Sequence, residues 1–229
     1  MTQTSVTEKL LQAIKAHVPF EGWSEAAFRA AAEDAGIDMA VARAACPRGA
    51  PDLAVAYHEA GDALMEARIE AADMSEMRFR DRIAAAVIWR LEAVEDRELV
   101  RRGMTHFALP QYAGEGTRLI WGTADRIWTA LGDTSRDVNW YTKRATLSGV
   151  YASTVLYWLG DASEDMVATR AFLDRRIDDV MQIEKVKAGV RDNRLLSTLL
   201  AGPARLMEQI KAPGDHTRTG MPGRWSGPT

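Results

Sequence analysis

The chain has 229 residues, of which 47% are hydrophobic, and a formal net charge of -3 at pH 7. Its length suits one large domain or two small ones, its composition is that of a soluble globular protein, and its charge excludes a strong general attraction to nucleic acid. The only cysteine, Cys46, excludes a disulfide framework and favours a cytoplasmic compartment. No run of about eighteen apolar residues predicts a membrane-spanning helix, and the N-terminus lacks the pattern of a signal peptide.

Helical periodicity runs along almost the whole chain, and no segment alternates as a strand would. We therefore predict an all-α protein of about ten helices, at roughly 5–17, 24–35, 38–46, 51–72, 75–94, 97–107, 115–131, 138–159, 163–187 and 192–211. Ser24 and Ser163 are the expected N-caps of two of these helices. Gly36, Gly132 and Gly160 stand where helices are expected to stop.

Residues 1–50 are predicted to form a three-helix unit with the layout of a helix-turn-helix. In a DNA-binding protein the last of these helices would read bases, but here it is "IDMAVARAAC", with one arginine and one acid. We expect a unit that does not read DNA. Residues 51–190 are predicted to form a helical bundle, 191–211 an amphipathic helix and 212–229 a disordered tail.

The sequence contains only incomplete versions of known catalytic motifs. "HEAGD" at His58 resembles a zinc-protease helix, but Asp62 replaces the second histidine, and no Glu-x-x-His pair exists for a di-iron site. "GEGTRL" at Gly114 follows no strand and lacks the third glycine of a phosphate-binding loop. The sequence thus predicts no catalytic residue, no metal and no cofactor, and we expect that the protein is not an enzyme.

The segment that follows Asp137 carries two different faces when it is placed on a helix at about 100° per residue. The bulky face holds Trp140, Arg144, Leu147, Tyr151 and Trp158, and the opposite face holds small residues, including Gly149. The small face favours either a closely packed neighbouring helix or space for an apolar ligand. The bulky start favours either a capped core helix or an interface anchor, in which case Arg144 is exposed.

The preceding helix carries Trp121, Asp125 and Trp128 in a stripe beside its core stripe. A wide buried face and a partly exposed apolar strip both explain this pattern. If the two helices hold a lipid, the candidate contacts are Trp128, Leu147, Gly149 and Tyr151.

The last periodic segment, residues 192–211, is rich in hydrophobic side chains and is flanked by arginines. It is either a helix docked on the bundle or an interfacial helix on anionic lipid. The candidate membrane-binding residues are Leu195, Leu196, Leu199, Leu200, Leu206 and Met207.

Two stretches, "DTSRDVNWYTKRATLSGVYASTVLYWLGDASED" and "TRAFLDRRIDDV", resemble the signature of the coenzyme-Q (ubiquinone) biosynthesis accessory family, the Coq-nine proteins. The likeness extends from about residue 18 to the final helix. It implies a fold like that of TetR regulators without DNA binding. Because such folds commonly dimerise, we expect a homodimer.

The resemblance also implies a function. The protein is expected to bind an isoprenoid quinone precursor or a phospholipid and to assist the di-iron demethoxyubiquinone hydroxylase at a membrane surface. The family's hydroxylase patch maps onto Asp125, Asp137, Trp140, Tyr141 and Arg144, and its membrane helix onto the segment from about Asp192. Because no transit peptide is visible, we expect a bacterial cytoplasmic protein, peripheral on the inner membrane. The alternative is a ligand-responsive transcriptional regulator of the TetR type.

Overall fold

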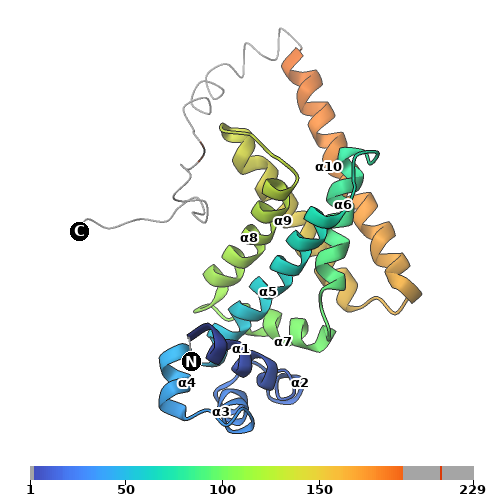
Figure 1. Ribbon diagram of the computed structural model, residues 1–229. Coiled ribbons are helices and arrows are strands. Elements are labelled where there is room, and N and C mark those ends of the chain that lie inside the picture. Colours follow the sequence, from blue (N-terminus) through green and yellow to red (C-terminus); the bar gives the residue numbers. More distant parts are fainter. Residues whose placement is uncertain (1–2, 193–211, 213–229) are drawn as a thin grey trace, which may run out of the picture. The chain divides into compact units, whose positions relative to one another are not determined.

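The computed structural model describes residues 3–192 and 212 of the chain, and every regular element within them is helical (Figure 1). In chain order the elements are α1 (Gln3–Ile14), α2 (Val18–Glu21), α3 (Glu25–Asp34), α4 (Met39–Ala45), α5 (Ala50–Ala71), α6 (Phe79–Glu92), α7 (Arg97–Phe107), α8 (Ala113–Ala130), α9 (Val138–Leu159), the short 3-10 helix η1 (Glu164–Met166) and α10 (Val167–Asp192). None of the described helices is long and apolar enough to cross a membrane.

The predicted all-α class and the first nine predicted helices are confirmed, with ends that differ by a few residues. Ser24 caps α3, since its hydroxyl accepts a hydrogen bond from the Ala27 amide at 3.2 Å. Gly36 and Gly132 follow helix ends with φ of 62° and 82°, a left-handed conformation that glycine adopts without steric cost. The four-residue α2 was not predicted. The predicted helix 192–211 and the predicted tail lie outside the described residues, apart from the ends Asp192 and Ala212.

The chain divides into two compact units. Unit 1 comprises Met1–Ala67 and Arg90–Leu119, and unit 2 comprises Arg68–Trp89 and Ile120–Thr229. This division differs from the domain boundaries predicted from the sequence, because α7 packs against α2 and thereby groups with the N-terminal helices.

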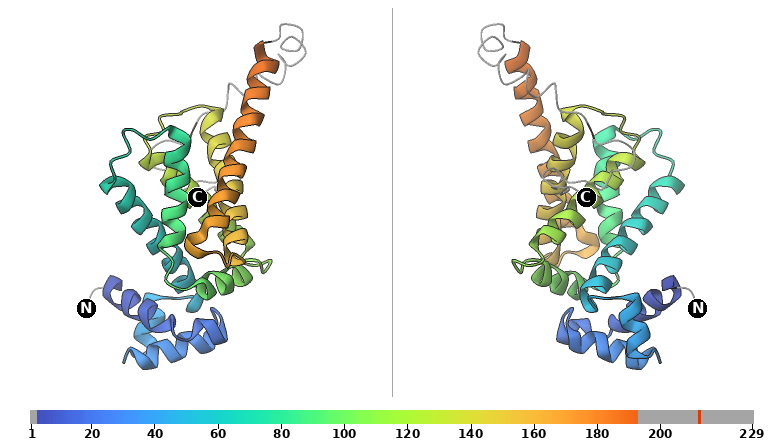
Figure 2. Two further views of the ribbon diagram at one scale, coloured as in Figure 1. Left: turned by 90° about the vertical axis from the view of Figure 1, so that its right-hand side faces the viewer. Right: turned by 90° about the vertical axis from the view of Figure 1, so that its left-hand side faces the viewer.

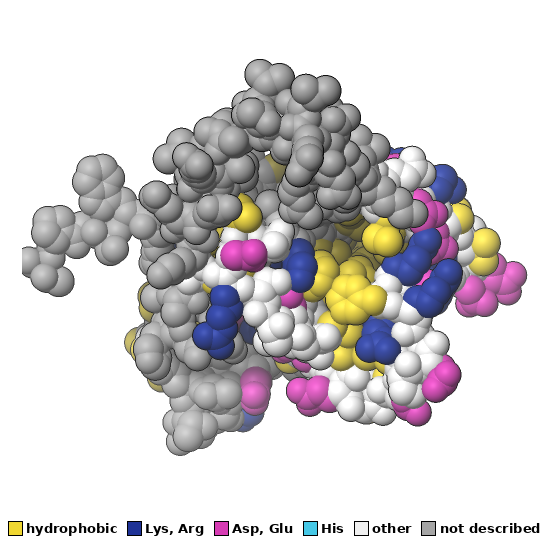
Figure 3. All heavy atoms as spheres, turned by 90° about the horizontal axis from the view of Figure 1, so that it is seen from above, with side chains coloured by type: hydrophobic (Ala, Val, Ile, Leu, Met, Phe, Trp, Pro, Cys, Tyr) yellow, Lys and Arg dark blue, Asp and Glu magenta, His cyan; other side chains and the backbone are white. Residues whose placement is uncertain are grey.

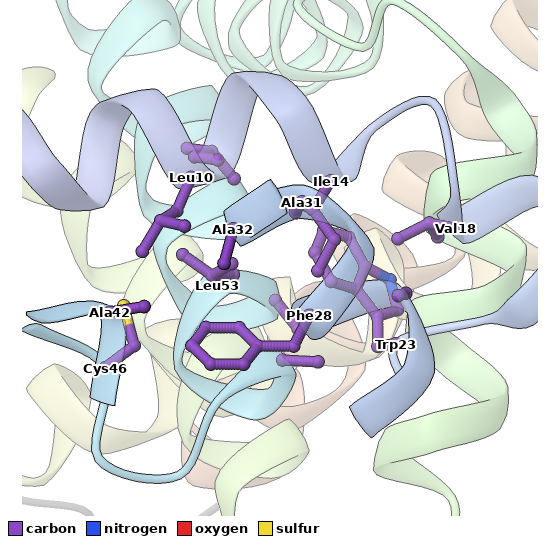
Figure 4. Packing of buried hydrophobic residues seen from close by; sticks show 14 of the residues in the cluster. Leu10, Ile14, Val18, Trp23, Phe28, Ala31, Ala32, Ala42, Cys46 and Leu53 are labelled. Atoms are coloured by element: carbon purple, nitrogen blue, oxygen red, sulfur yellow. The ribbon is translucent and has the colours of Figure 1, made fainter. Parts of the chain in front are cut away.

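The core of unit 1 is assembled by the N-terminal helices (Figure 4). Phe28 from α3 and Leu10 and Ile14 from α1 are completely buried there. Trp23 completes this core, and its indole N–H donates to the Leu99 carbonyl of α7 at 3.1 Å. These packed side chains make α1 to α4 a stable scaffold.

The core of unit 2 is formed largely by α8, α9 and α10, and Figure 2 shows α9 and α10 side by side. α8 contributes Ile127, α9 contributes Leu147 and Trp158, and α10 contributes Leu173 and Ile177. The bulky face of α9 is therefore a core face along its length.

The turn between α9 and α10 departs from the predicted helix start at Ser163. Asp161 is buried, and its carboxylate accepts hydrogen bonds from the Ser163 amide at 2.8 Å and from the Thr169 amide and hydroxyl. Between them, Asp165 and Met166 both have positive φ, 50° and 56°, which is unusual outside glycine. The Ser163 hydroxyl accepts from the Ala168 amide at 3.0 Å, one turn later than an N-cap at 163 would require.

Candidate functional site

The candidate site is built around Arg144, on the second turn of α9. Its side chain is 2% exposed, and its Nε atom lies 2.5 Å from Asp125 Oδ1 of α8. Its Nη1 atom lies 2.9 Å from Asp133 Oδ2 and donates to the Trp140 carbonyl at 3.2 Å. One guanidinium thus joins α8, the α8–α9 connection and the start of α9.

Asp133 is the second centre of this network. Lys143 Nζ lies 2.8 Å from Asp133 Oδ1, and the Ser135 hydroxyl donates to the same oxygen at 2.8 Å. Burial acts to raise the pKa of Asp133, but the hydrogen bonds from Lys143, Arg144 and Ser135 outweigh it and lower the pKa to about 2. The carboxylate is therefore charged at every physiological pH.

Aromatic rings surround the network on one side. The Arg144 guanidinium lies 4.1 Å from the centroid of the Trp140 ring, which contacts Tyr141 edge-on at 4.8 Å and Trp121 at 5.9 Å. Trp121 Nε1 is buried and has no hydrogen-bond partner among the described residues. Cation–π contact and close packing hold these rings in fixed orientations.

Four of the five predicted partner-binding residues meet here: Asp125, Trp140, Tyr141 and Arg144. The fifth, Asp137, caps α9, since its carboxylate accepts from the Asn139 amide at 3.1 Å. The expectation that Arg144 is exposed at an interface is wrong, because two carboxylates draw the guanidinium inward. Trp140 is also buried, at 7% exposure, whereas Asp137 is exposed and Tyr141 is half-buried.

A second aromatic group borders the network. Trp128 of α8 is half-buried, its indole N–H donates to the Lys143 carbonyl at 3.1 Å, and Lys143 Nζ lies 5.0 Å from its ring centroid. Its ring packs against Phe79, the first residue of α6, at 5.5 Å, and Phe79 is 46% exposed. This pair places a partly open apolar surface beside a cation.

Hydrophobic side chains gather in a hollow on the face that Figure 3 views, which is the end where α6 begins and α8 connects to α9 (Figure 1). Lys and Arg side chains border the hollow in that view. A cavity with an apolar interior and cationic borders suits an amphipathic ligand that carries a polar head.

The predicted lipid contacts lie in different surroundings. Trp128 is half-buried, Leu147 and Tyr151 are core residues with 4% exposure each, and Gly149 is exposed. A Cβ atom at Gly149 would meet nothing within 4 Å, so none of the described helices packs closely on the small face of α9 at that glycine. Of the four, Trp128 is the best placed for a ligand because it lies beside exposed Phe79.

The predicted membrane-binding residues Leu195, Leu196, Leu199, Leu200, Leu206 and Met207 lie outside the described residues. Three residues of the network, Asp133, Ser135 and Lys143, were not predicted. Asp133 follows Gly132 at a helix end and resembles an ordinary turn residue, while Lys143 adjoins Arg144 in sequence. Nothing in their spacing predicts that the α8–α9 connection folds back onto α9.

The segment that carries this network also matches a known family. Residues 113–184 match the family model COQ9. The resemblance to the COQ9 family is confirmed. These residues span α8, α9 and most of α10, so the COQ9 match contains the entire Arg144 network.

Curated COQ9 proteins extend the likeness. The ubiquinone biosynthesis protein COQ9, mitochondrial, of Rattus norvegicus is 30% identical over 196 residues, which are 80% of this chain and 61% of the relative. The proteins of the same name from Xenopus tropicalis and Homo sapiens are 29% and 26% identical over 190 residues each, covering 79% and 80% of this chain and 59% of either relative. The chain therefore spans about three fifths of the length of the COQ9 proteins that it matches.

The fold has a counterpart among solved structures. A TetR transcriptional regulator from Nitrosomonas europaea superposes with a TM-score of 0.63 at 18% sequence identity, covering 75% of this chain and 95% of the regulator. At this identity the match shows the fold alone. The predicted TetR-like fold is confirmed.

Proposed function

We propose that this protein is a non-catalytic, lipid-binding accessory protein of ubiquinone biosynthesis. The observations that carry the proposal are the hydrophobic hollow that Figure 3 shows and the partly exposed Phe79–Trp128 pair of unit 2, in a chain similar to ubiquinone biosynthesis proteins. The ligand is an isoprenoid quinone precursor, and a phospholipid is the other amphipathic candidate.

A carrier protein is needed because the isoprenoid precursor partitions from water into the bilayer. An isoprenoid tail in water is driven into the bilayer, and each methylene that an apolar cavity buries contributes about 0.8 kcal/mol. A hollow lined with hydrophobic side chains therefore extracts part of the tail at little cost. The Lys143 ammonium lies beside Trp128 and already pairs with Asp133, so this surface favours an uncharged polar head over an anionic one.

The proposed partner is the di-iron demethoxyubiquinone hydroxylase that acts late in the pathway. The proposed docking patch for the hydroxylase comprises the five residues predicted from the sequence. Some of them contact the partner directly, and the others hold those contact residues in place. Exposed Asp137 and half-buried Tyr141 make the direct contacts. Trp140 and Arg144 are buried and, with Asp125, hold Tyr141 and the start of α9 in place. A rigid aromatic at the centre of a pre-organised surface is the usual composition of an interface anchor.

The proposed site of action is the membrane surface that stores the precursor, which in a bacterium is the cytoplasmic face of the inner membrane. The mitochondrial names of the relatives fit a membrane-bound pathway. The predicted peripheral contact runs through the segment from about Asp192.

Lipid capture by the hollow is tested by equilibrium extraction of a short-tailed ubiquinone analogue from liposomes. Phe79→Asp places a charge in the partly exposed Phe79–Trp128 pair, and we expect it to weaken capture at least tenfold. Leu156→Asp is the matched control, since Leu156 is 60% exposed on α9, and it is expected to capture the analogue at the parental level. Equal capture by both variants would contradict the proposed lipid site.

A TetR-type regulator is the second candidate, because the fold is shared. The arginines of α4, the helix that would read DNA, and of the turn that follows it argue against DNA binding. Arg43 pairs with Glu25, and Arg48 pairs with Asp52 at 2.6 Å and with Glu115 at 2.9 Å. Because these guanidinium groups are held by acids, few cations are left for phosphates. A gel shift with genomic DNA at physiological salt that shows a specific complex would favour the regulator.

A further inference from the structure

The long helix α10 packs on the core of unit 2 only through its first half. Its buried side chains are Thr169, Leu173 and Ile177, and no described side chain of α10 beyond Ile177 is buried. The stretch from Ile177 to Asp192 is about 22 Å long at about 1.5 Å per residue. A tilt of about 10° at Ile177 would therefore move the end of the helix by about 4 Å. Burial of Leu173 and Ile177 alone leaves the direction of this lever weakly fixed.

Arg80 of α6 contacts α10 at the place where this burial ends. Its Nη1 atom pairs with the carboxylate of Asp178, and its Nη2 atom lies 3.7 Å from Asp174 Oδ1. Asp174 and Asp178 are one helical turn apart, so both carboxylates lie on the same side of α10. Asp178 directly follows Ile177 in the chain. The guanidinium therefore clamps α10 immediately after its last buried residue.

The guanidinium of Arg80 is also oriented from its own helix. Its Nε atom lies 3.6 Å from Asp81 Oδ1, and the Arg80 side chain is 24% exposed. Asp81 in turn accepts a hydrogen bond from Arg78 Nε at 2.6 Å. The planar fork of Arg80 is thus held towards the two carboxylates of α10 before it pairs with them.

The carboxylates of this clamp are open to dissolved ions. The side chains of Asp174 and Asp178 are 60% and 50% exposed. Exposed ion pairs are weak and are screened by salt, whereas the burial of Leu173 and Ile177 is not. Salt therefore weakens the clamp and leaves the packed first half of α10 in place.

From these contacts we infer that Arg80 is an ionic latch, which fixes the direction in which α10 leaves the core of unit 2 and whose opening lets the second half of the helix swing. The latch does not rest on the proposed function, since all its contacts lie within unit 2. One consequence does rest on it. Because α10 leads to the segment from about Asp192, the latch sets the direction in which the proposed membrane contact begins.

The distance between two spin labels on the full chain tests the latch. Labels at Ala145→Cys on α9 and Ala188→Cys on α10, with Cys46→Ala to leave no other thiol, report the direction of α10 by pulsed electron paramagnetic resonance. We expect one narrow distance distribution at an ionic strength on the order of 0.01 M and a roughly twofold wider one at about 1 M, where the screening length falls to about 3 Å. A distribution that is already wide in low salt, or that stays narrow in high salt, would overturn the inference.

Variants assign the effect to Arg80. Arg80→Gln should give the wide distribution already in low salt. Arg78→Gln removes the same charge two residues away, where the guanidinium pairs with Asp81, and as the matched control it should keep the narrow distribution. Arg80→Glu should widen the distribution, and adding Asp178→Arg should restore it by exchanging the two charges. A narrow distribution in Arg80→Gln, an equally wide one in Arg78→Gln, or an exchange that restores nothing would refute the latch.

Discussion

Arg144 connects three segments of unit 2 through one buried guanidinium. Its partners, Asp125 and Asp133, come from α8 and from the connection that follows, and its aromatic neighbour Trp140 comes from α9. Removing one partner from such a buried network leaves the other charges without compensation, which is costly in a medium of low polarity. The network is therefore a determinant of the fold of unit 2.

Arg144→Ala is therefore expected to lower the free energy of unfolding by about 3–5 kcal/mol. The physical reason is that Asp133, whose side chain is 2% exposed, loses one of its two cationic partners. Urea denaturation measures the change. Arg136→Ala, at an exposed position in the same connection, is the control and should change stability by less than about 0.5 kcal/mol. A near-neutral Arg144→Ala would show that the buried network does not hold the segments together.

The ionisation of Asp133 predicts a loss of stability in acid. Its pKa is about 2 in the folded protein, below the ordinary value of about 3.9 for an unfolded chain. The resulting stabilisation of about 2 kcal/mol is fully present above the unfolded pKa and is lost as the pH falls towards 2. Lys143→Met removes one hydrogen bond to the carboxylate and should reduce this stabilisation.

The urea midpoints of the parent and of Lys143→Met, measured from pH 6 down to pH 2, check this. We expect the difference between the two proteins to shrink as the pH falls, because protonation of Asp133 removes the interaction that distinguishes them. A difference that is constant with pH would mean that Lys143 stabilises the fold by packing on Trp128 alone.

At the scale of elements, the start of α9 combines a cap with a proposed contact surface. The Asp137 carboxylate accepts from the Asn139 amide, and a serine hydroxyl can do the same without the charge. Asp137→Ala should cost about 1 kcal/mol of stability, whereas Asp137→Ser should melt like the parent. If the charge also contacts the hydroxylase, Asp137→Ser should still reduce capture of the hydroxylase in a pull-down. Parental capture by a stable Asp137→Ser would remove Asp137 from the docking patch.

Most of the helices could be predicted from the sequence, because helix formation depends on residues that are close together along the chain. Periodicity and caps predict α3 to α9 to within a few residues, including the Ser24 cap. The turn before α10 was not predicted, since its paired positive φ angles at Asp165 and Met166 occur in residues that do not favour them.

The inward position of Arg144 was also missed. It depends on where the α8–α9 connection brings Asp133, a relation between segments that no helical period encodes.

To exchange lipid with a bilayer as proposed, the whole molecule has to reach a membrane. The predicted contact is the oily segment 195–210, in which each basic residue near an anionic surface adds about 1 kcal/mol. Changing both Leu199 and Leu200 to Glu should abolish flotation with anionic liposomes and leave the helical circular dichroism intact. Flotation that survives this change would assign membrane binding to another surface.

Native mass spectrometry of the purified protein, combined with lipid extraction, tests whether the protein carries an isoprenoid lipid as proposed. The account predicts a population of the intact chain with bound mass that the extract identifies as an isoprenoid quinone or its precursor, with a phospholipid as a competing occupant. The same spectrum reports whether the protein is a homodimer. Protein that is lipid-free and that also fails to take up an added ubiquinone analogue would contradict the account.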